Sequence, residues 1–311
     1  MTKLPPLVAI IGPTAVGKTE ISIHLAEQLN GEIVSADSRL LYRGMDIGTA
    51  KPSPEDRARV PHHLIDVTEP ENPWSLGLFR RAAHEAIEAI HLRGRLPFLV
   101  GGTGQYVLAI LEGWSPPPKS DDPDVRSELE NFASAHGSQT LHERLADIDP
   151  DTASRIDHRN VRRVVRALEI YHVTGFPPSQ QRIVQPPPFR VLRVGLSLPR
   201  SELYARIDAR IDAMLETGLV KEVEGLLARG LPPDLPAMTA IGYRQIAGYL
   251  QGVISLDEAV RQMRRATRQF VRRQSNWFKA DDPHIHWFEA RQGVEESIEG
   301  LVRTWLGENG D

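Results

Sequence analysis

The chain has 311 residues, of which 41% are hydrophobic and 25% charged, and its formal net charge is −4. This length suits one large or two modest domains with a buried core, and the negative charge excludes a polycation, so any contact with nucleic acid has to come from local patches. The chain has no cysteine, which excludes disulfides, thiolate metal sites and cysteine nucleophiles, and because no stretch resembles a signal peptide or a membrane span we expect a cytoplasmic protein.

A phosphate-binding loop follows the first predicted strand. Residues 7–12 are an unbroken apolar run, typical of a strand buried on both faces, and apolar residues recur at helical spacing after the loop. Between them the spacing G-x-x-x-x-G-K-T matches the P-loop in full. Backbone N–H groups would converge on phosphate oxygens, Lys18 would neutralise their charge, and the Thr19 hydroxyl would ligate Mg²⁺. The loop consists of Gly12, Pro13, Thr14, Ala15, Val16, Gly17, Lys18 and Thr19.

The loop does not specify whose phosphates it binds. We find no base-recognition motif, so the phosphates could belong to ATP or to any other diphosphate ester. A glycine turn without a ligand is the simpler alternative, and the strand before the loop and the helix after it argue against that alternative.

A carboxylate is predicted at the end of the second strand. Residues 31–37 indicate a strand that ends at Asp37, at the edge of the sheet where the ligands of open α/β proteins bind. Asp37 could hold Mg²⁺ or act as a general base beside the phosphates, and capping a following helix is the structural alternative. Residues 35–52 are rich in glycine and polar side chains, which indicates a functional loop.

Glycines also mark the third predicted strand, at residues 96–104. Three of the four residues from Gly101 to Gly104 are glycine, which lets a ligand or another backbone approach closely. A tight strand-to-helix turn would need the same glycines. We expect Thr103 to be a polar contact in the wall of the site.

The order of these elements predicts the fold class. Further strands are expected at residues 191–198 and 284–290, and a helix at 80–91. Apolar strands that alternate with helices indicate an α/β fold, here a P-loop NTPase-like, mainly parallel sheet flanked by helices.

A second, smaller domain is predicted inside the first. Two proline-rich stretches flank a mostly helical segment, which we interpret as an insertion at residues 115–189. The core domain would then comprise residues 1–114 and 190–311. A long, partly helical loop is the alternative.

Two segments are rich in arginine. Residues 159–166 place valines on one helical face and arginines mostly on the other, and residues 261–279 contain six arginines and one lysine, no acid, and interleaved aromatic side chains. An RNA backbone would suit such charges, and aromatic rings near it could stack bases. A solvated helix face with its aromatic residues in the core is the alternative, and these features alone do not decide between the two.

Arg206 and Arg210 lie one helical turn apart after the predicted strand at 191–198. Either side chain could reach the phosphate site, and either could instead pair with Asp208 or Asp212.

Taken together, the motifs resemble those of the tRNA dimethylallyltransferases, also called tRNA isopentenyltransferases. The matching segments, in order, are GPTAVGKT, SADSRLLYRGMDIGTAKP, HHLIDV, FLVGGTGQY, RRVVRALE, MTAIGYRQ and TRQFVRRQSNWF. They extend over nearly the whole chain. That family moves a dimethylallyl group from dimethylallyl diphosphate to the exocyclic amine of the adenosine 3′-adjacent to the anticodon of tRNA, and it needs Mg²⁺.

The resemblance implies a role for each matching position. Separately, we expect the protein to be a monomer. Lys18 and Arg210 would bind the diphosphate, Thr19 would lie near Mg²⁺, and Asp37 would accept a proton from the adenine amine. The residues expected to contact tRNA are Asp37, Ser38, Arg39, Leu40, Thr103, Arg126, Asn160, Val161, Arg162, Arg163, Val164, Met238, Thr239, Ala240, Ile241, Gly242 and Tyr243.

Two positions depart from the family pattern, and two other functions are alternatives to prenyl transfer. Many members have glutamine at the position of Leu40 and leucine at that of Gln105, so the Leu40 contact would rest on its backbone.

A small-molecule P-loop kinase would explain the loop and the inserted domain but leaves residues 261–279 without a function. A non-catalytic RNA-binding switch would make poor use of Asp37.

Overall fold

The computed structural model describes residues 4–114, 123–181 and 186–308. The chain divides into two compact units, one of residues 1–111 and 187–311 and one of residues 112–186. The insertion predicted at 115–189 begins at a residue outside the described ranges.

The larger unit contains one parallel sheet. Its six strands among the described residues follow the order β3-β2-β4-β1-β5-β6, and every neighbouring pair is parallel. The predicted α/β class and parallel sheet are confirmed; only β3, two residues long, gave no signal in the sequence. The strands are β1 (Pro6–Ile11), β2 (Gly31–Ser35), β3 (His62–His63), β4 (Leu96–Gly101), β5 (Arg190–Ser197) and β6 (Ile285–Glu289).

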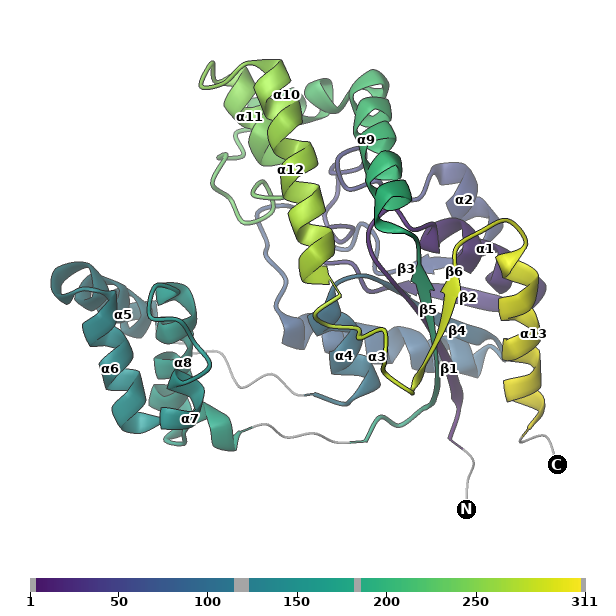
Figure 1. Cartoon of the computed structure of the whole chain (residues 1–311), viewed down its shortest axis with the longest axis horizontal. Coiled ribbons are helices and arrows are strands. Elements are labelled where there is room, and N and C mark those ends of the chain that lie inside the picture. Colours follow the sequence, from purple (N-terminus) through teal and green to yellow (C-terminus); the bar gives the residue numbers. More distant parts are fainter. Residues whose placement is uncertain (1–3, 115–122, 182–185, 309–311) are drawn as a thin grey trace. The chain divides into compact units, whose positions relative to one another are not determined.

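Helices cover both faces of this sheet (Figure 1). Because successive strand residues point to opposite faces, Val8 and Ile10 join one hydrophobic cluster and Leu7 and Ile11 the other. The first cluster includes residues of α1 and of α9–α13, and the second includes those of α3 and α4. The helices are α1 (Lys18–Gln28), α2 (Pro54–Arg59), α3 (Leu76–Leu92), α4 (Gly104–Leu111), α9 (Arg200–Thr217), α10 (Leu219–Ala228), α11 (Tyr243–Leu250), α12 (Leu256–Gln274) and α13 (Val294–Gly307). No helix of the described residues combines the length and apolar character needed to cross a membrane.

Strand order positions the functional segments. The three strands β2, β4 and β1 are neighbours in the sheet. Because all strands are parallel, the phosphate loop after β1, Asp37 after β2 and Thr103 after β4 emerge at the same edge. Three segments that are far apart in the sequence therefore meet at the carboxyl edge of the sheet.

The smaller unit is a helical bundle with its own core. Leu141 and Leu145 pack against Val164, Val165 and Leu168. Arg159, Arg162 and Arg163 are exposed, as the periodicity predicts, whereas Arg166 is half-buried and pairs with the buried Glu169 (3.5 Å). The helices are α5 (Pro123–His136), α6 (Ser138–Ile148), α7 (Pro150–Ala153) and α8 (Val161–Thr174), followed by a 3-10 turn, Pro178–Gln180.

We predict that Gly101→Ala destabilises the larger unit. A Cβ at Gly101 would stand 2.3 Å from the backbone oxygen of Ala36, so β2 and β4 would have to separate where they deliver Asp37 and Thr103. Overpacking of this kind costs about 1–3 kcal/mol, measured as the free energy of unfolding in denaturant.

Gly225→Ala is the matched control. Gly225 lies in α10 with nothing within 4 Å of an added Cβ, so alanine there should leave the stability unchanged or raise it by up to about 1 kcal/mol. Equal effects of the two substitutions would contradict the close approach at Gly101.

Candidate functional site

The phosphate loop has the backbone that its glycines predict. Gly17 has φ 106°, in the left-handed region, and it directly precedes the first residue of α1, Lys18. The exposed Thr19 follows in the first turn. The N-terminal end of α1 therefore presents the N–H groups of its first turn and the positive end of the helix dipole, an arrangement that favours an anion.

Lys18 lies against the loop in which it occurs. Its Nζ donates hydrogen bonds to the carbonyl oxygens of Gly12 (3.0 Å) and Pro13 (2.8 Å). Burial of the ammonium group lowers the pKa of Lys18 to about 8, an effect that the charge of Asp37 opposes and that of Arg210 reinforces. A further negative charge in this place would stabilise the ammonium form.

A cavity of about 420 Å³ opens beside the loop and is rich in positive charge. Lys18, Arg206 and Arg210 line it, with Asp37 among its acidic groups. Arg206 donates a hydrogen bond to the carbonyl of Val16 (3.3 Å), which holds it over the loop. Burial lowers the pKa of Arg210, and Asp37 counteracts this. We call this space the phosphate cavity.

The wall of the phosphate cavity also offers oxygen ligands suited to Mg²⁺. The Ser35 hydroxyl is buried and makes no hydrogen bond within the described part of the chain. It lines the cavity together with Thr19 and Asp37. Mg²⁺ in phosphate sites takes one or two protein oxygens, substrate phosphates and several waters, so these residues fit such an ion.

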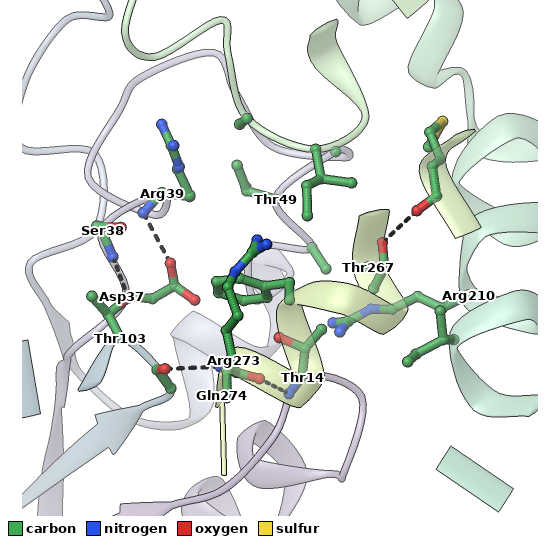
Figure 2. Close-up of a pocket in the computed structure, with 18 of the residues that line it drawn as sticks. Thr14, Asp37, Ser38, Arg39, Thr49, Thr103, Arg210, Thr267, Arg273 and Gln274 are labelled. Carbon is green, nitrogen blue, oxygen red and sulfur yellow. Dashed lines mark hydrogen bonds between the residues drawn. The ribbon is translucent and has the colours of Figure 1, made fainter. Parts of the chain in front are cut away.

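A second cavity of about 470 Å³ adjoins the first (Figure 2). Its inner wall is largely apolar, with Ile207, Met214, Met263 and Phe270, and Trp277, 40% exposed, also lines it. We call it the base cavity, for its planar and apolar lining. The residues shared by the two cavities are Thr14, Asp37, Thr49, Ala50 and Arg210.

Asp37 lies where the two cavities meet. One carboxylate oxygen, Oδ1, accepts the backbone N–H of Arg39 (2.9 Å), and the Thr103 hydroxyl accepts that of Ser38 (3.2 Å). Figure 2 shows Asp37 on one side of the base cavity and Arg210 on the other. Within the described part of the chain Oδ2 accepts no hydrogen bond, so this oxygen is available to a ligand.

The structure brings some of the predicted tRNA contacts to the base cavity and leaves others away from it. Thr103, Thr239 and Ile241 line this cavity, as does Gln105, whereas Leu40 lines the phosphate cavity. The side chains of Met238 and Tyr243 are fully buried, which leaves them no surface for a contact with tRNA. The expectation for these two side chains is therefore corrected.

The predicted contacts in the smaller unit differ in their exposure. The Arg126 guanidinium binds the buried Glu169 carboxylate through two hydrogen bonds of 2.7 Å, and this pairing lowers the pKa of Glu169. Val164 is fully buried in the bundle. Arg162 and Arg163 are exposed and have no acidic partner among the described residues.

Tyr243 has a different function, in a clamp on the loop that lines both cavities. The Glu222 carboxylate accepts the backbone N–H groups of Asp46 (2.9 Å), Ile47 (2.7 Å) and Gly48 (3.1 Å). It also accepts the Tyr243 hydroxyl (2.6 Å). Sequence reasoning missed Glu222, because nothing near residue 222 indicates a partner so distant in the chain.

The arginines of α12 are not equivalent. Arg264 pairs with Asp212 and Arg268 with Asp208, both on α9. Arg265 and Arg272 have no acidic partner among the described residues, and they line one groove with Tyr204. Arg273 lies in the base cavity. The predicted basic face is thus partly neutralised, and two arginines of the groove are left to attract an anion.

These features define a protein of P-loop NTPase-like fold in which a cationic cavity and a partly apolar cavity meet at one carboxylate. The family model "IPP transferase" matches residues 40–281, and the chain belongs to this family. A tRNA dimethylallyltransferase of Roseiflexus sp. (strain RS-1) is 51% identical over 97% of this chain and 99% of its own length. One of Thermomicrobium roseum is 49% identical over 100% of this chain and 94% of its own.

Solved structures agree. The full-length tRNA isopentenylpyrophosphate transferase of Bacillus halodurans is similar with a TM-score of 0.73 and 42% identity, covering 98% of each chain. A eukaryotic dimethylallyltransferase acting on tRNA gives a TM-score of 0.82 at 27% identity, over 96% of this chain and 77% of its own. The comparisons give no support to a small-molecule kinase or to a non-catalytic RNA-binding switch.

We predict that the affinity for inorganic diphosphate falls as the pH rises above about 8. Lys18 is an ammonium ion below its pKa of about 8, and above it the free protein must take up a proton to bind the anion with a charged lysine. The loss should approach about tenfold per pH unit, measured by isothermal titration calorimetry. Lys18→Met is the control, since the titration of diphosphate itself affects both proteins; identical pH profiles would contradict the prediction.

Proposed function

We propose that the chain transfers a dimethylallyl group from dimethylallyl diphosphate to N6 of the adenosine 3′-adjacent to the anticodon in tRNAs, giving N6-isopentenyladenosine and diphosphate. The observation that carries the proposal is the junction of a cationic and a largely apolar cavity at one carboxylate, Asp37. Membership of the IPP transferase family and the names of the relatives support the same reaction.

The phosphate cavity suits a leaving group. When the bond between C1 of the dimethylallyl group and the diphosphate oxygen breaks, its electron pair stays on that oxygen, and negative charge grows there. Lys18, Arg210 and the N–H groups at the start of α1 lie where they stabilise this charge, without reorganisation at the moment of reaction.

The base cavity suits the nucleophile. The adenosine leaves its stack and enters this cavity, as in other enzymes that act on a base, and its amine approaches the electrophilic carbon at the junction. As the N6–C1 bond forms, the nitrogen loses a proton to Asp37, so the carboxylate is the general base. Its Oδ1 is held by the backbone of Arg39, and Oδ2 is free to accept the proton.

Mg²⁺ belongs to the same proposal. The Thr19 hydroxyl would ligate it, with Ser35 and Asp37 as nearby oxygen groups. When bound, the ion neutralises charge on the diphosphate oxygens. Competition between ATP and dimethylallyl diphosphate would show whether ATP also binds the loop.

Each unit offers its own candidate contacts with tRNA. In the larger unit these are Thr103 and Thr239 in the base cavity and the basic groove with Arg265 and Arg272, and in the smaller unit they are the exposed Arg162 and Arg163. We propose a monomer as the working form, because residues of one chain line both cavities.

We predict that the purified chain, given Mg²⁺ and labelled dimethylallyl diphosphate, labels unmodified tRNA that carries consecutive adenosines next to the anticodon. Asp37→Asn should lower turnover by about 100- to 10,000-fold, the usual contribution of a general base, with tRNA affinity nearly unchanged. Labelling of free AMP but not of tRNA would contradict the substrate, and an equal loss of tRNA binding in Asp37→Asn would make Asp37 a recognition residue.

We also predict that Arg265→Ala combined with Arg272→Ala weakens tRNA binding and reduces its salt dependence. Each lost phosphate contact should lower the slope of log K against log [salt] by about 1, so the pair by about 2. The matched control is Arg291→Ala with Arg303→Ala, which removes the same charge from arginines paired with Glu289 and Glu299. A slope that changes equally in both pairs would contradict a specific contact in the groove.

A further inference from the structure

One side chain, Gln274, connects the phosphate loop, β4 and α12. It is the last residue of α12 and is 5% exposed. Its Oε1 accepts the backbone N–H of Thr14 (2.7 Å), and its Nε2 donates to the carbonyl of Gly102 (2.8 Å), as Figure 2 shows. The motif of residues 261–279 drew attention to its arginines and aromatics, not to this amide.

The orientation of the amide is fixed by its partners. A rotation by half a turn would direct the NH₂ group at the N–H of Thr14 and the oxygen at the carbonyl of Gly102, so that neither bond could form. The space is also closed, since a Cβ on Gly102 would stand 2.2 Å from Nε2. The Gln274 oxygen is therefore fixed in place, and it fixes the direction in which the Thr14 N–H points.

The Thr14 N–H, which Gln274 binds, belongs to the same peptide unit as the Pro13 carbonyl, which accepts a hydrogen bond from Lys18. The Pro13 carbonyl, which accepts the Lys18 Nζ at 2.8 Å, and the Thr14 N–H belong to one planar group. Fixing the direction of the N–H therefore fixes that of the carbonyl. A hydrogen bond accepted from the N–H also polarises the carbonyl and makes it a better acceptor for the ammonium.

We propose that Gln274 is a positioning residue for Lys18, acting through the Pro13–Thr14 peptide to set the place from which the ammonium reaches the departing diphosphate. This inference rests on the proposed function, in which Lys18 binds that diphosphate. It makes α12 more than an RNA-binding surface, because the helix that carries Arg272 and Arg273 also orders the phosphate loop.

A double-mutant cycle tests whether Gln274 acts through Lys18. Gln274→Met keeps the length of the side chain and removes both hydrogen bonds. We expect it to lower kcat by about 10- to 100-fold, with the KM for tRNA unchanged. In the Lys18→Met background the same change should have almost no further effect, because there is no longer an ammonium to position. The affinity for inorganic diphosphate should follow the same pattern.

The control substitution lies in the same helix, α12. Gln262→Met makes the identical change at an exposed site of α12, where the amide bonds Glu258 and no other described residue, and it should leave kcat unchanged. Effects of Gln274→Met and Lys18→Met that multiply would overturn the positioning role, as would a kcat unchanged in Gln274→Met. If Gln274→Met fails to fold, Gln274→Ala, a smaller side chain that also removes both hydrogen bonds, goes through the same cycle with the same criterion. A wild-type chain that does not prenylate tRNA would contradict the proposed function itself.

Discussion

The charge of Asp37 stabilises two half-buried cations, Lys18 and Arg210, in the wall of the phosphate cavity. Burial lowers the pKa of both Lys18 and Arg210, and on each of them Asp37 is the charge that counteracts this. Three separate segments supply the three groups: the residues after β2, the first turn of α1, and α9. The order of the strands and the position of α9 bring the three charged groups together. A shift of any one of these elements would leave a half-buried charge without its counter-charge.

This cluster also matches the movement of charge in the proposed reaction. Asp37 loses its negative charge when it accepts a proton, and the leaving group gains one as its bond to carbon breaks. The total charge near Lys18 and Arg210 therefore changes little between reactants and products. A site of low dielectric constant tolerates such a transfer better than the creation of a new charge, because little solvent has to reorganise.

Local patterns predicted the parts of the site that depend on local structure. The loop after β1, Asp37 after β2 and the glycines after β4 follow from apolar runs and glycine spacing, which are properties of neighbouring residues. The bond between Gln274 and Thr14 joins residues separated by 260 positions, and no pattern along the chain indicates it. Likewise, residues 261–279 contain no acid, but α9 supplies Asp208 and Asp212 to two of their arginines. In the same way, the buried Tyr243 donates its hydroxyl to Glu222, and no pattern along the chain indicates this pair.

The carboxylate of Glu222 occupies backbone donors at the edge of the base cavity. It accepts three successive N–H groups, of Asp46, Ile47 and Gly48, and successive N–H groups of this kind can bind an anion. Gly48 lines the base cavity, and the two residues after it line both cavities. Because these donors are already satisfied by a side chain of the protein, they do not compete with the start of α1 for an anion.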